Sequence, residues 1–498
     1  MIYNFNLGIG WASSGVEYAQ SYRAKVLRNI GQPAKFIFSD MFPKDNLVEM
    51  TRNIGFKDDE IIWLYTFFTD YTPEPVTYTL DDLKSTIAGQ NYKYERDGKI
   101  GRILFEGQND FYRVYFVNAD GDYVHRVEMV SRGCLVRKDY FMSGRVFSEY
   151  YAPLDGKAHM YHRRFFNRDG SLAYEEINDD ENVMYKFPDK LLCSKEDLIG
   201  YMVSKMNLTK DDVVIIDRTT GQGQAILENV KDAKVGIVIH ADHFSEGATD
   251  DDYILWNNYY EYSFSMHDHI DFYITATDEQ GKLLKEQFKK YNNATPNVVT
   301  IPVGALPELK KPEGKRKPHS LITASRLATE KHVDWLVDAV VQAHKDIPDI
   351  SLDIYGKGAA SKALEEQIKK YGADSYIRLM GQHDLTDVYK DYEAYLSGST
   401  SEGFGLTLME AIGSGLPIIG FDVRYGNKTF IDEGKNGYKL PYSVGMEKGR
   451  RLNNMVNAIK KMFLEDDLEA MHQHSYKKAE KYLASEVEAK WENLIKTI

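Results

Sequence analysis

Two glutamates flank a glycine-rich turn in the C-terminal third of the chain. Glu402 and Glu410 form an E-x7-E pattern, and Gly403, Phe404 and Gly405 follow the first glutamate directly. Glycines between a strand and a helix let ligand oxygens approach the backbone N–H groups of the helix start, which suits a sugar phosphate. Thr407 and Glu410 also have capping-box spacing, so a purely structural role for Glu410 at a helix N-terminus stays open.

A second segment carries two cations five residues apart. Arg326 and Lys331 follow the apolar run 321–324. Two fixed cations can neutralise a departing diphosphate, and each charge-assisted hydrogen bond of this kind contributes about 1.5–3 kcal/mol. Open α/β sheets bind ligands at the carboxyl ends of their strands, where this segment and the glycine turn both fall. The two segments therefore predict one anion-binding site.

Two histidines end another apolar run. His240 and His243 follow residues 234–239 and precede an acidic loop. A single histidine is more often structural than functional, but two at the end of a strand favour a site. We expect His240 to be the stronger candidate and His243 the weaker one.

The elements that must position these residues follow an α/β pattern in two blocks. Residues 2–9 predict a strand that leads through a glycine loop into a helix over 16–30 and a second strand over 34–38. Further apolar runs predict buried strands, and a polar segment rich in Pro and Lys predicts a linker. These strands are expected at 212–217, 234–239, 272–275, 321–324, 351–355, 376–379, 394–396 and 417–421, with the linker at 307–319 and helices from about 450 onward.

A segment of different character interrupts the first block. Four Asp-Gly pairs, which favour hairpin turns, alternate with Tyr- and Phe-rich runs of strand length. This pattern predicts an inserted antiparallel meander, which suits a macromolecular partner better than a small acceptor. The turns are Asp97-Gly98, Asp120-Gly121, Asp155-Gly156 and Asp169-Gly170, and the runs include 101–106, 111–117, 123–130 and 160–166.

These patterns predict an α/β protein with two Rossmann-like domains and an inserted β-meander. A chain of 498 residues exceeds the size of one hydrophobic core, which agrees with several domains. The expected boundaries are 1–69 with 191–306 for a discontinuous N-terminal domain, 70–190 for the insertion, 307–319 for the linker and 320–498 for the C-terminal domain with its terminal helices.

Composition excludes several classes of function. A formal net charge of −13 argues against a nucleic-acid binder, which needs a basic surface. The two cysteines, Cys134 and Cys193, form neither a disulfide framework nor a zinc site and fit a reducing cytosol. We see no signal segment or membrane span, so we expect a cytoplasmic protein, with peripheral contact at the inner face of the cell membrane left open. Asp120 and Asp122 match the Asp-x-Asp string of metal-dependent transferases, but they lie in an expected hairpin, so we predict no metal.

The motifs together resemble those of a known family. Arg326, Lys331 and the E-x7-E pattern around Gly-Phe-Gly are similar to retaining glycosyltransferases of the two-domain GT-B architecture. Over nearly the whole chain, including residues 8–18 and the insertion, the sequence resembles the GtfA family of accessory-Sec protein O-GlcNAc transferase subunits of Gram-positive bacteria.

The resemblance implies a reaction, partners and roles. It implies transfer of GlcNAc from UDP-GlcNAc to Ser or Thr of a serine-rich repeat adhesin, as the first step of its O-glycosylation, with a homologous GtfB-like subunit and no cofactor. Two other hypotheses about the function stay open: a carbohydrate-metabolic or wall-polymer transferase of the same architecture, and a non-catalytic chaperone subunit. The implied roles are diphosphate binding by Arg326 and Lys331, proximity to the diphosphate for Gly15, Val16, Glu17 and Tyr18, ribose binding by Glu410, donor-sugar contact by His240, Glu402, Gly403, Phe404 and Gly405, and proximity to the base for Gln382 and His383.

Overall fold

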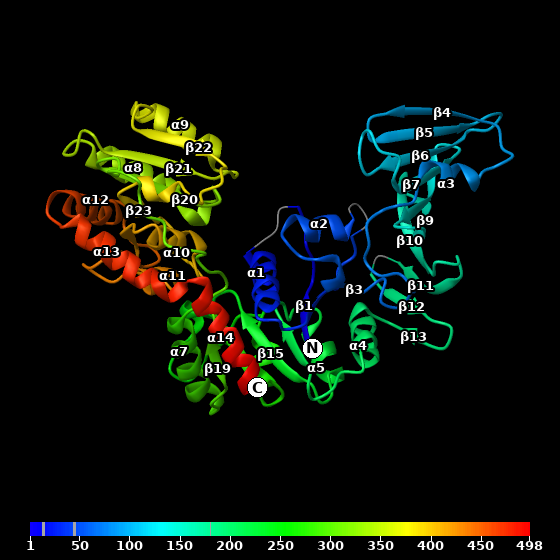
Figure 1. Cartoon of the computed structure of the whole chain (residues 1–498), viewed down its shortest axis with the longest axis horizontal. Coiled ribbons are helices and arrows are strands. Elements are labelled where there is room, and N and C mark those ends of the chain that lie inside the picture. The colour runs from blue at the N-terminus through cyan, green and yellow to red at the C-terminus, as the bar shows by residue number, and fades with distance from the viewer. Residues whose placement is uncertain (12–14, 43–45, 180) are drawn as a thin grey trace. The chain divides into compact units, whose positions relative to one another are not determined.

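A computed structural model describes residues 1–11, 15–42, 46–179 and 181–498 (Figure 1). The chain divides into two compact units, which we describe separately. Unit 1 comprises Met1–Val238 and Asn258–Asp271, and unit 2 comprises Ile239–Asn257 and Phe272–Ile498. Along the described part of the chain, no helix is both long and apolar enough to cross a bilayer.

Unit 1 contains a parallel sheet with the strand order β15-β14-β1-β2-β3. Ile2 of the central strand lies opposite Val213 on one side and Ala34 on the other. The strands at 34–38 and 234–239 lie where the sequence predicts them, because both are short apolar runs between turns. The elements are β1 (Ile2–Asn6), α1 (Gly15–Asn29), β2 (Ala34–Phe38), α2 (Leu47–Asn53), β3 (Ile61–Trp63), α4 (Lys195–Lys205), β14 (Val213–Ile216), α5 (Gly223–Asn229), β15 (Lys234–Ile239) and α6 (Glu261–Ser265).

The insertion is an antiparallel ten-stranded sheet in which every strand pairs with its neighbour in sequence (Figure 1). The four Asp-Gly pairs lie at the turns between its strands, as predicted, with Asp97 as the last residue of β4 and the other pairs wholly in turns. At Asp155-Gly156 both residues have positive φ, as in the favoured two-residue hairpin turns. The elements are α3 (Leu80–Ser85), β4 (Tyr92–Asp97), β5 (Ile100–Phe105), β6 (Asp110–Phe116), β7 (Val124–Ser131), β8 (Cys134–Phe141), β9 (Arg145–Leu154), β10 (Lys157–Phe166), β11 (Leu172–Asn178), β12 (Val183–Lys186) and β13 (Leu191–Leu192).

Stacked aromatic rings join this sheet to the rest of unit 1. Tyr65, just after β3, stacks on Phe165 of β10 with ring centroids 5.8 Å apart. Phe68 stacks on Tyr201 of α4 at 5.0 Å and packs edge-on against Tyr174 of β11 at 6.0 Å. Each such pair adds about 0.5–1.5 kcal/mol beyond its buried area. The insertion therefore shares a core with the parallel sheet.

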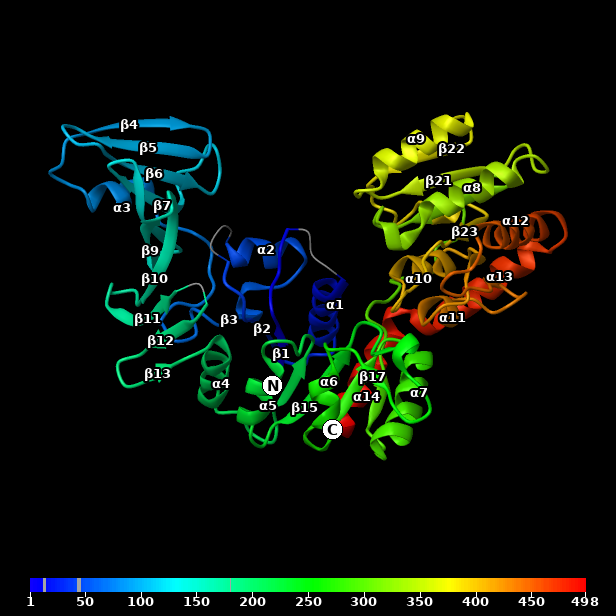
Figure 2. The same ribbon diagram turned by 180° about the vertical axis from the view of Figure 1, so that it is seen from behind.

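Unit 2 contains a six-stranded parallel sheet with the order β22-β21-β20-β23-β24-β25 (Figure 2). This is the strand arrangement of a Rossmann-like domain, which the alternating strand and helix pattern predicts. Its elements are β20 (Ser320–Ala324), α8 (Val333–Ala343), β21 (Ser351–Tyr355), α9 (Ser361–Tyr371), β22 (Ile377–Gly381), β23 (Ala394–Leu396), α10 (Leu406–Gly413), β24 (Ile418–Phe421), α11 (Gly426–Phe430), β25 (Gly437–Leu440), α12 (Lys448–Leu464), α13 (Leu468–Ala479) and α14 (Ala484–Thr497).

Unit 2 also holds smaller elements before this sheet. The short strands β16 (Phe244–Ser245) and β17 (Leu255–Trp256) pair antiparallel, and β18 (Phe272–Thr275) pairs parallel with β19 (Val298–Thr300). The helix α7 (Asp278–Gln287) lies between β18 and β19 in sequence. Compactness thus groups 239–257 and 272–306 with the C-terminal sheet, whereas the sequence-based boundaries place these residues in the N-terminal domain. The boundaries derived from sequence remain predictions.

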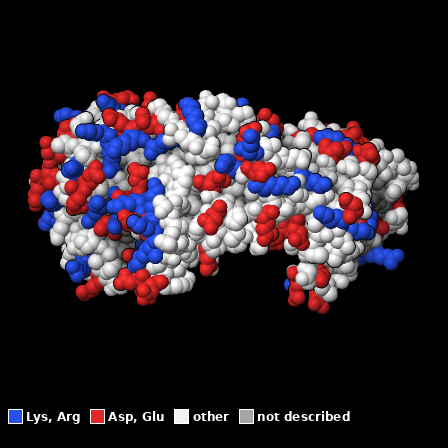
Figure 3. All heavy atoms as spheres, turned by 90° about the horizontal axis from the view of Figure 1, so that it is seen from below, with Lys and Arg blue, Asp and Glu red and all other residues white. Residues whose placement is uncertain are grey.

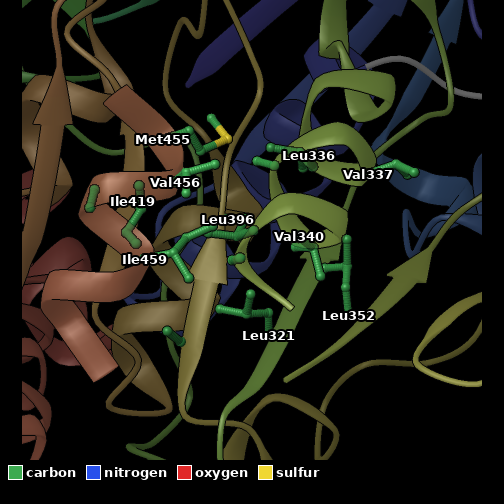
Figure 4. Packing of buried hydrophobic residues seen from close by; sticks show 14 of the residues in the cluster. Leu321, Leu336, Val337, Val340, Leu352, Leu396, Ile419, Met455, Val456 and Ile459 are labelled. Atoms are coloured by element: carbon green, nitrogen blue, oxygen red, sulfur yellow. The ribbon is translucent and has the colours of Figure 1, made fainter. Parts of the chain in front are cut away.

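The core of unit 2 shows why its sheet forms. Alternate strand residues face α8 and α12, and Leu321, Leu352 and Leu396 pack there against Leu336 and Ile459 (Figure 4). The residues between them, such as Ile322 and Tyr395, belong to a second cluster that includes residues of α10. This alternation is the period of two that a sheet buried on both faces requires.

Charged side chains of both signs are interspersed on the face of the molecule drawn in Figure 3. On that face, acidic and basic groups lie side by side over the same surface. This mixed distribution agrees with a composition that contains 62 Lys and Arg beside 75 Asp and Glu.

Candidate active site

The glycine turn lies at the start of α10, as the sequence predicts. Gly405 precedes the helix with a φ of 89°, a backbone conformation that residues other than glycine rarely adopt. The helix begins at Leu406, and no side chain caps its start. Thr407 instead accepts a hydrogen bond from Tyr395 Oη at 3.1 Å. The capping-box alternative for Thr407 and Glu410 is therefore wrong.

Glu410 lines a cavity of about 180 Å³. Its Oε2 accepts a hydrogen bond from Tyr389 Oη at 3.1 Å. Burial raises the pKa of the Glu410 carboxyl, and the nearby Asp384 adds to this direction, while the Tyr389 hydrogen bond opposes it. A partly buried carboxylate beside a cavity can accept hydrogen bonds from a polyol such as a ribose.

Several residues that line this cavity belong to no sequence motif and were not predicted. Tyr389 is buried, and the segments 305–308 and 384–386 also line the cavity. The first segment lies just before and within the predicted linker, so the pattern of Pro and Lys hides its contribution. Gln382 and His383, predicted near the base, are exposed in the loop after β22 and are not among the lining residues; His383 Nε2 lies 2.7 Å from the carbonyl oxygen of Met380. The position of this loop at a strand's carboxyl end was the signal that could have extended the prediction to 384–386.

Lys331 and Glu402 form an ion pair at the carboxyl ends of β20 and β23. Lys331 Nζ donates to Glu402 Oε2 at 2.7 Å, and each side chain is 19% exposed. The pair brings together the cation segment and the E-x7-E segment, which the sequence predicts to share one site. A cation fixed by a partly buried carboxylate is preorganised to meet negative charge.

Arg326 lies in the same loop but faces solvent. Its side chain is 79% exposed, and its Nη2 donates to Glu330 Oε1 at 3.2 Å. An exposed pair of this kind adds little to stability. Arg326 is therefore only weakly held by the protein, whereas Lys331 is held in place.

His240 directly follows β15 and lies against the glycine turn. A Cβ added to Gly403 would stand 3.0 Å from the His240 carbonyl oxygen, which is tighter than most Cβ contacts, so a side chain there would require a small shift of this backbone. The loop after β24 ties the turn from the other side, because Tyr425 N donates to the Glu402 carbonyl at 2.6 Å. Phe404 turns its ring into the core, where it packs edge-on against Phe430 at 5.2 Å. Its backbone, rather than its ring, faces the turn.

His243 has a structural environment, which differs from the expectation that it contacts the substrate. It is fully buried, with Nε2 2.6 Å from Gln287 Oε1 and Nδ1 3.1 Å from Tyr425 Oη. Burial lowers its pKa to about 4, so the ring is neutral at pH 7. Both ring nitrogens thus bind protein groups, and the ring positions the loop that carries Tyr425.

The predicted phosphate loop of the N-terminal domain belongs to unit 1. Gly15, Val16, Glu17 and Tyr18 form the first turn of α1, and the preceding residues 12–14 lie outside the described ones. Tyr18 is exposed, whereas Glu17 is buried and accepts a hydrogen bond from Asn6 Nδ2 at 3.2 Å. Glu17 therefore anchors the helix start, which its predicted role beside a ligand did not anticipate.

The Asp-x-Asp string lies in a turn of the inserted sheet. Asp120 and Asp122 connect β6 to β7, and Asp122 pairs with Arg96 at 3.2 Å. Within residues 1–11, 15–42, 46–179 and 181–498, no group of three or more His, Cys, Asp or Glu side chains could hold a metal ion.

Comparisons with known proteins find matches for both the inserted sheet and the C-terminal sheet. Residues 307–482 match the model of the glycosyl transferases group 1, and residues 93–189 match the GtfA extended beta-sheet domain. The chain is 53% identical over 498 residues to the GtfA subunit of a UDP-N-acetylglucosamine–peptide N-acetylglucosaminyltransferase of Streptococcus gordonii, covering 100% of this chain and 98% of the relative. It is also similar to a chain of a GtfA/B complex crystal structure, with a TM-score of 0.96, 53% identity and coverage of 100% and 99%. The pneumococcal O-GlcNAc transferase GtfA, solved with UDP and GlcNAc, gives a TM-score of 0.89 and 48% identity, with coverage of 99% and 98%.

Two Rossmann-like sheets with a glycine turn, an E-x7-E pair and a fixed lysine define a GT-B glycosyltransferase. The ion pair between Lys331 and Glu402 lies at the carboxyl ends of β20 and β23, the edge at which open α/β sheets generally bind ligands. The chain belongs to the family of GtfA subunits of UDP-N-acetylglucosamine–peptide N-acetylglucosaminyltransferases.

Proposed function

We propose that this chain transfers GlcNAc from UDP-GlcNAc to Ser or Thr of a serine-rich repeat adhesin, as the first step of its O-glycosylation. It acts with a GtfB-like partner subunit. The observation that carries the proposal is the Lys331–Glu402 pair beside the glycine turn, in a chain 53% identical to a GtfA subunit along its whole length. We place the reaction in the cytoplasm, with peripheral contact at the inner face of the cell membrane.

The proposed chemistry retains the configuration of the anomeric carbon. UDP leaves as the bond between the anomeric carbon and the phosphate oxygen breaks, and the acceptor hydroxyl attacks from the same face. Lys331 and Arg326 neutralise the departing diphosphate, which is the part of the reaction where negative charge develops. The leaving phosphate oxygen accepts the proton of the acceptor hydroxyl, so the step needs no separate protein base.

The remaining residues hold the donor. Glu410 accepts hydrogen bonds from the ribose, in the cavity that also contains Tyr389. The backbone at Gly403 and Gly405 and the side chains of Glu402 and His240 face the sugar. The same charges make a metal unnecessary, so we propose that the reaction proceeds without a divalent cation.

One assay tests the proposal. The chain is incubated with and without its partner subunit, a serine-rich peptide and each of UDP-GlcNAc, UDP-glucose and UDP-galactose, and the mass of the peptide is measured. We expect additions of one GlcNAc mass, largest with the partner present. Glucose transfer alone, or transfer to no peptide under any condition, would refute the proposal.

A further inference from the structure

Two residues outside the site described above contact the loop that carries Lys331. Gly398 lies two residues beyond β23, and Trp335 lies in the first turn of α8. Both contact the backbone or side chain of residues next to Lys331 and lie outside the motifs described above.

Gly398 touches the backbone of the loop directly. A Cβ added there would stand 2.7 Å from the carbonyl oxygens of both Lys331 and His332. Such distances are shorter than real Cβ contacts, and neither carbonyl is the end of a flexible side chain. A side chain at position 398 would therefore displace the backbone that carries Lys331.

Trp335 contacts the loop through the side chain of His332. His332 adopts a left-handed conformation, with a φ of 45°, at the junction between the 3-10 turn Thr329–Lys331 and α8. Its ring stacks on Trp335 with centroids 3.6 Å apart and an interplanar angle of 9°. The Arg451 guanidinium of α12 lies 3.5 Å from the centroid of the Trp335 ring. Stacking and cation–π contacts of this kind offset the strain of a left-handed non-glycine residue.

We propose that Gly398 and Trp335 are positioning residues that fix Lys331 against Glu402 for transfer. The inference rests on the proposed function, because it assigns these residues to the same diphosphate site. A displacement of about 1 Å in a preorganised site can lower turnover by roughly 100-fold. Under this proposal the turnover number depends on a glycine and a tryptophan that act only through the position of Lys331.

A double-mutant cycle tests the role of Gly398. Gly398→Ala, Lys331→Ala and the double variant are assayed with the partner subunit, UDP-GlcNAc and a serine-rich peptide. We expect Gly398→Ala to lower kcat/KM by about 10- to 100-fold. The same substitution should cost nothing further in the Lys331→Ala background, because it acts through that lysine. Gly314→Ala is the matched control: an added Cβ there meets no atom within 4 Å, and we expect a change below about two-fold.

The outcomes separate the inference from the proposed function. If the wild-type complex transfers no GlcNAc, the proposed function fails. If it transfers GlcNAc but Gly398→Ala has the same cost with and without Lys331, the inference fails and the function stands. Wild-type turnover in Lys331→Ala would overturn the site assignment and the inference together.

A second pair of variants tests the inference if Gly398→Ala does not fold. Trp335→Phe keeps an aromatic face for His332, whereas Trp335→Leu keeps an apolar side chain without the stack. We expect the Phe variant to stay within about three-fold of wild-type turnover and the Leu variant to lose about ten-fold, with similar unfolding temperatures. Equal turnover in the two variants would overturn the role of Trp335.

Discussion

Glu402 holds Lys331 by a hydrogen bond of 2.7 Å between side chains that are both mostly shielded from water. The pairing joins two segments 71 residues apart in sequence. A lysine that is already oriented loses little entropy when it meets a phosphate, whereas the exposed Arg326 must be ordered on binding. The two cations of the site are thus expected to contribute unequally.

This difference gives the first prediction. Lys331→Ala should lower kcat by roughly 10²–10³, as removal of a preorganised charge stabiliser does, and Arg326→Ala should have a smaller effect. Steady-state kinetics with UDP-GlcNAc and a serine-rich peptide measure both. Lys370→Ala, on the exposed face of α9, is the control for loss of a positive charge. A larger loss for Arg326→Ala than for Lys331→Ala would contradict this ranking.

The partly buried carboxyl of Glu410 predicts a pH dependence of nucleotide binding. Burial raises its pKa, so the carboxylate gains a proton at a higher pH than an ordinary glutamate. UDP affinity, measured by calorimetry, should therefore fall as the pH is lowered toward that raised value. Glu410→Gln should bind UDP about five- to ten-fold more weakly at pH 7, because a neutral acceptor replaces a charged one, and should lose this pH dependence. An unchanged pH profile in the Gln variant would assign the titration to another group.

The neutral, buried His243 predicts a loss of stability in acid. Its pKa is lowered to about 4 from an ordinary 6.5, so the unfolded chain binds a proton that the folded one rejects. Between pH 6.5 and 4 the free energy of unfolding should therefore fall, by up to roughly 3 kcal/mol from this group. Denaturant unfolding at pH 7 and pH 4.5 should show a smaller difference for His243→Asn than for the wild type, while exposed His269→Asn should match the wild type.

The proposed absence of a metal predicts resistance to chelation. Transfer by the complex should persist in excess EDTA, because Lys331 and Arg326 carry the charge that a divalent ion supplies elsewhere. Peptide mass after incubation with EDTA, with and without added Mg²⁺ or Mn²⁺, measures this. Activity that disappears with EDTA and returns with metal would bring Asp120 and Asp122 back into consideration.

Exposed apolar side chains on the inserted sheet predict where the partner subunit docks. Ile177 and Met184 lie opposite each other on β11 and β12 and are 44% and 37% exposed. Replacing both with Asp should abolish co-purification of the partner and leave UDP affinity unchanged. Val444→Asp changes a 95% exposed residue of unit 2 and serves as the control. Undiminished co-purification would place the interface elsewhere.

Local patterns predicted most of the fold. The apolar runs at 351–355 and 394–396 are strands with the predicted bounds, because a buried strand needs little beyond its own apolar residues. The Asp-Gly turns likewise determine their hairpins locally. The short strands β3 and β25 carry weaker patterns and were not predicted.

The site was predictable only where a motif is continuous in sequence. Lys331 and Glu402 were predicted to share a site because each follows a strand, and the structure pairs them. Tyr389 reaches the Glu410 cavity only through the packing of the chain, which no spacing reveals. His243 fitted a functional pattern, but its ring contacts Tyr425, which is distant in sequence. Thr407 fitted a capping pattern, but the helix begins after Gly405, whose conformation the spacing does not reveal.

The strict chain order of the inserted sheet has a consequence for how the protein is made. Each of its strands pairs with the one synthesised just before it, so hairpins can form while the chain is still emerging from the ribosome. The parallel sheet of unit 1 must wait, because Ile2 pairs with Val213 and the ten strands lie between them in sequence. The insertion is therefore expected to be largely formed before the sheet that carries it can close.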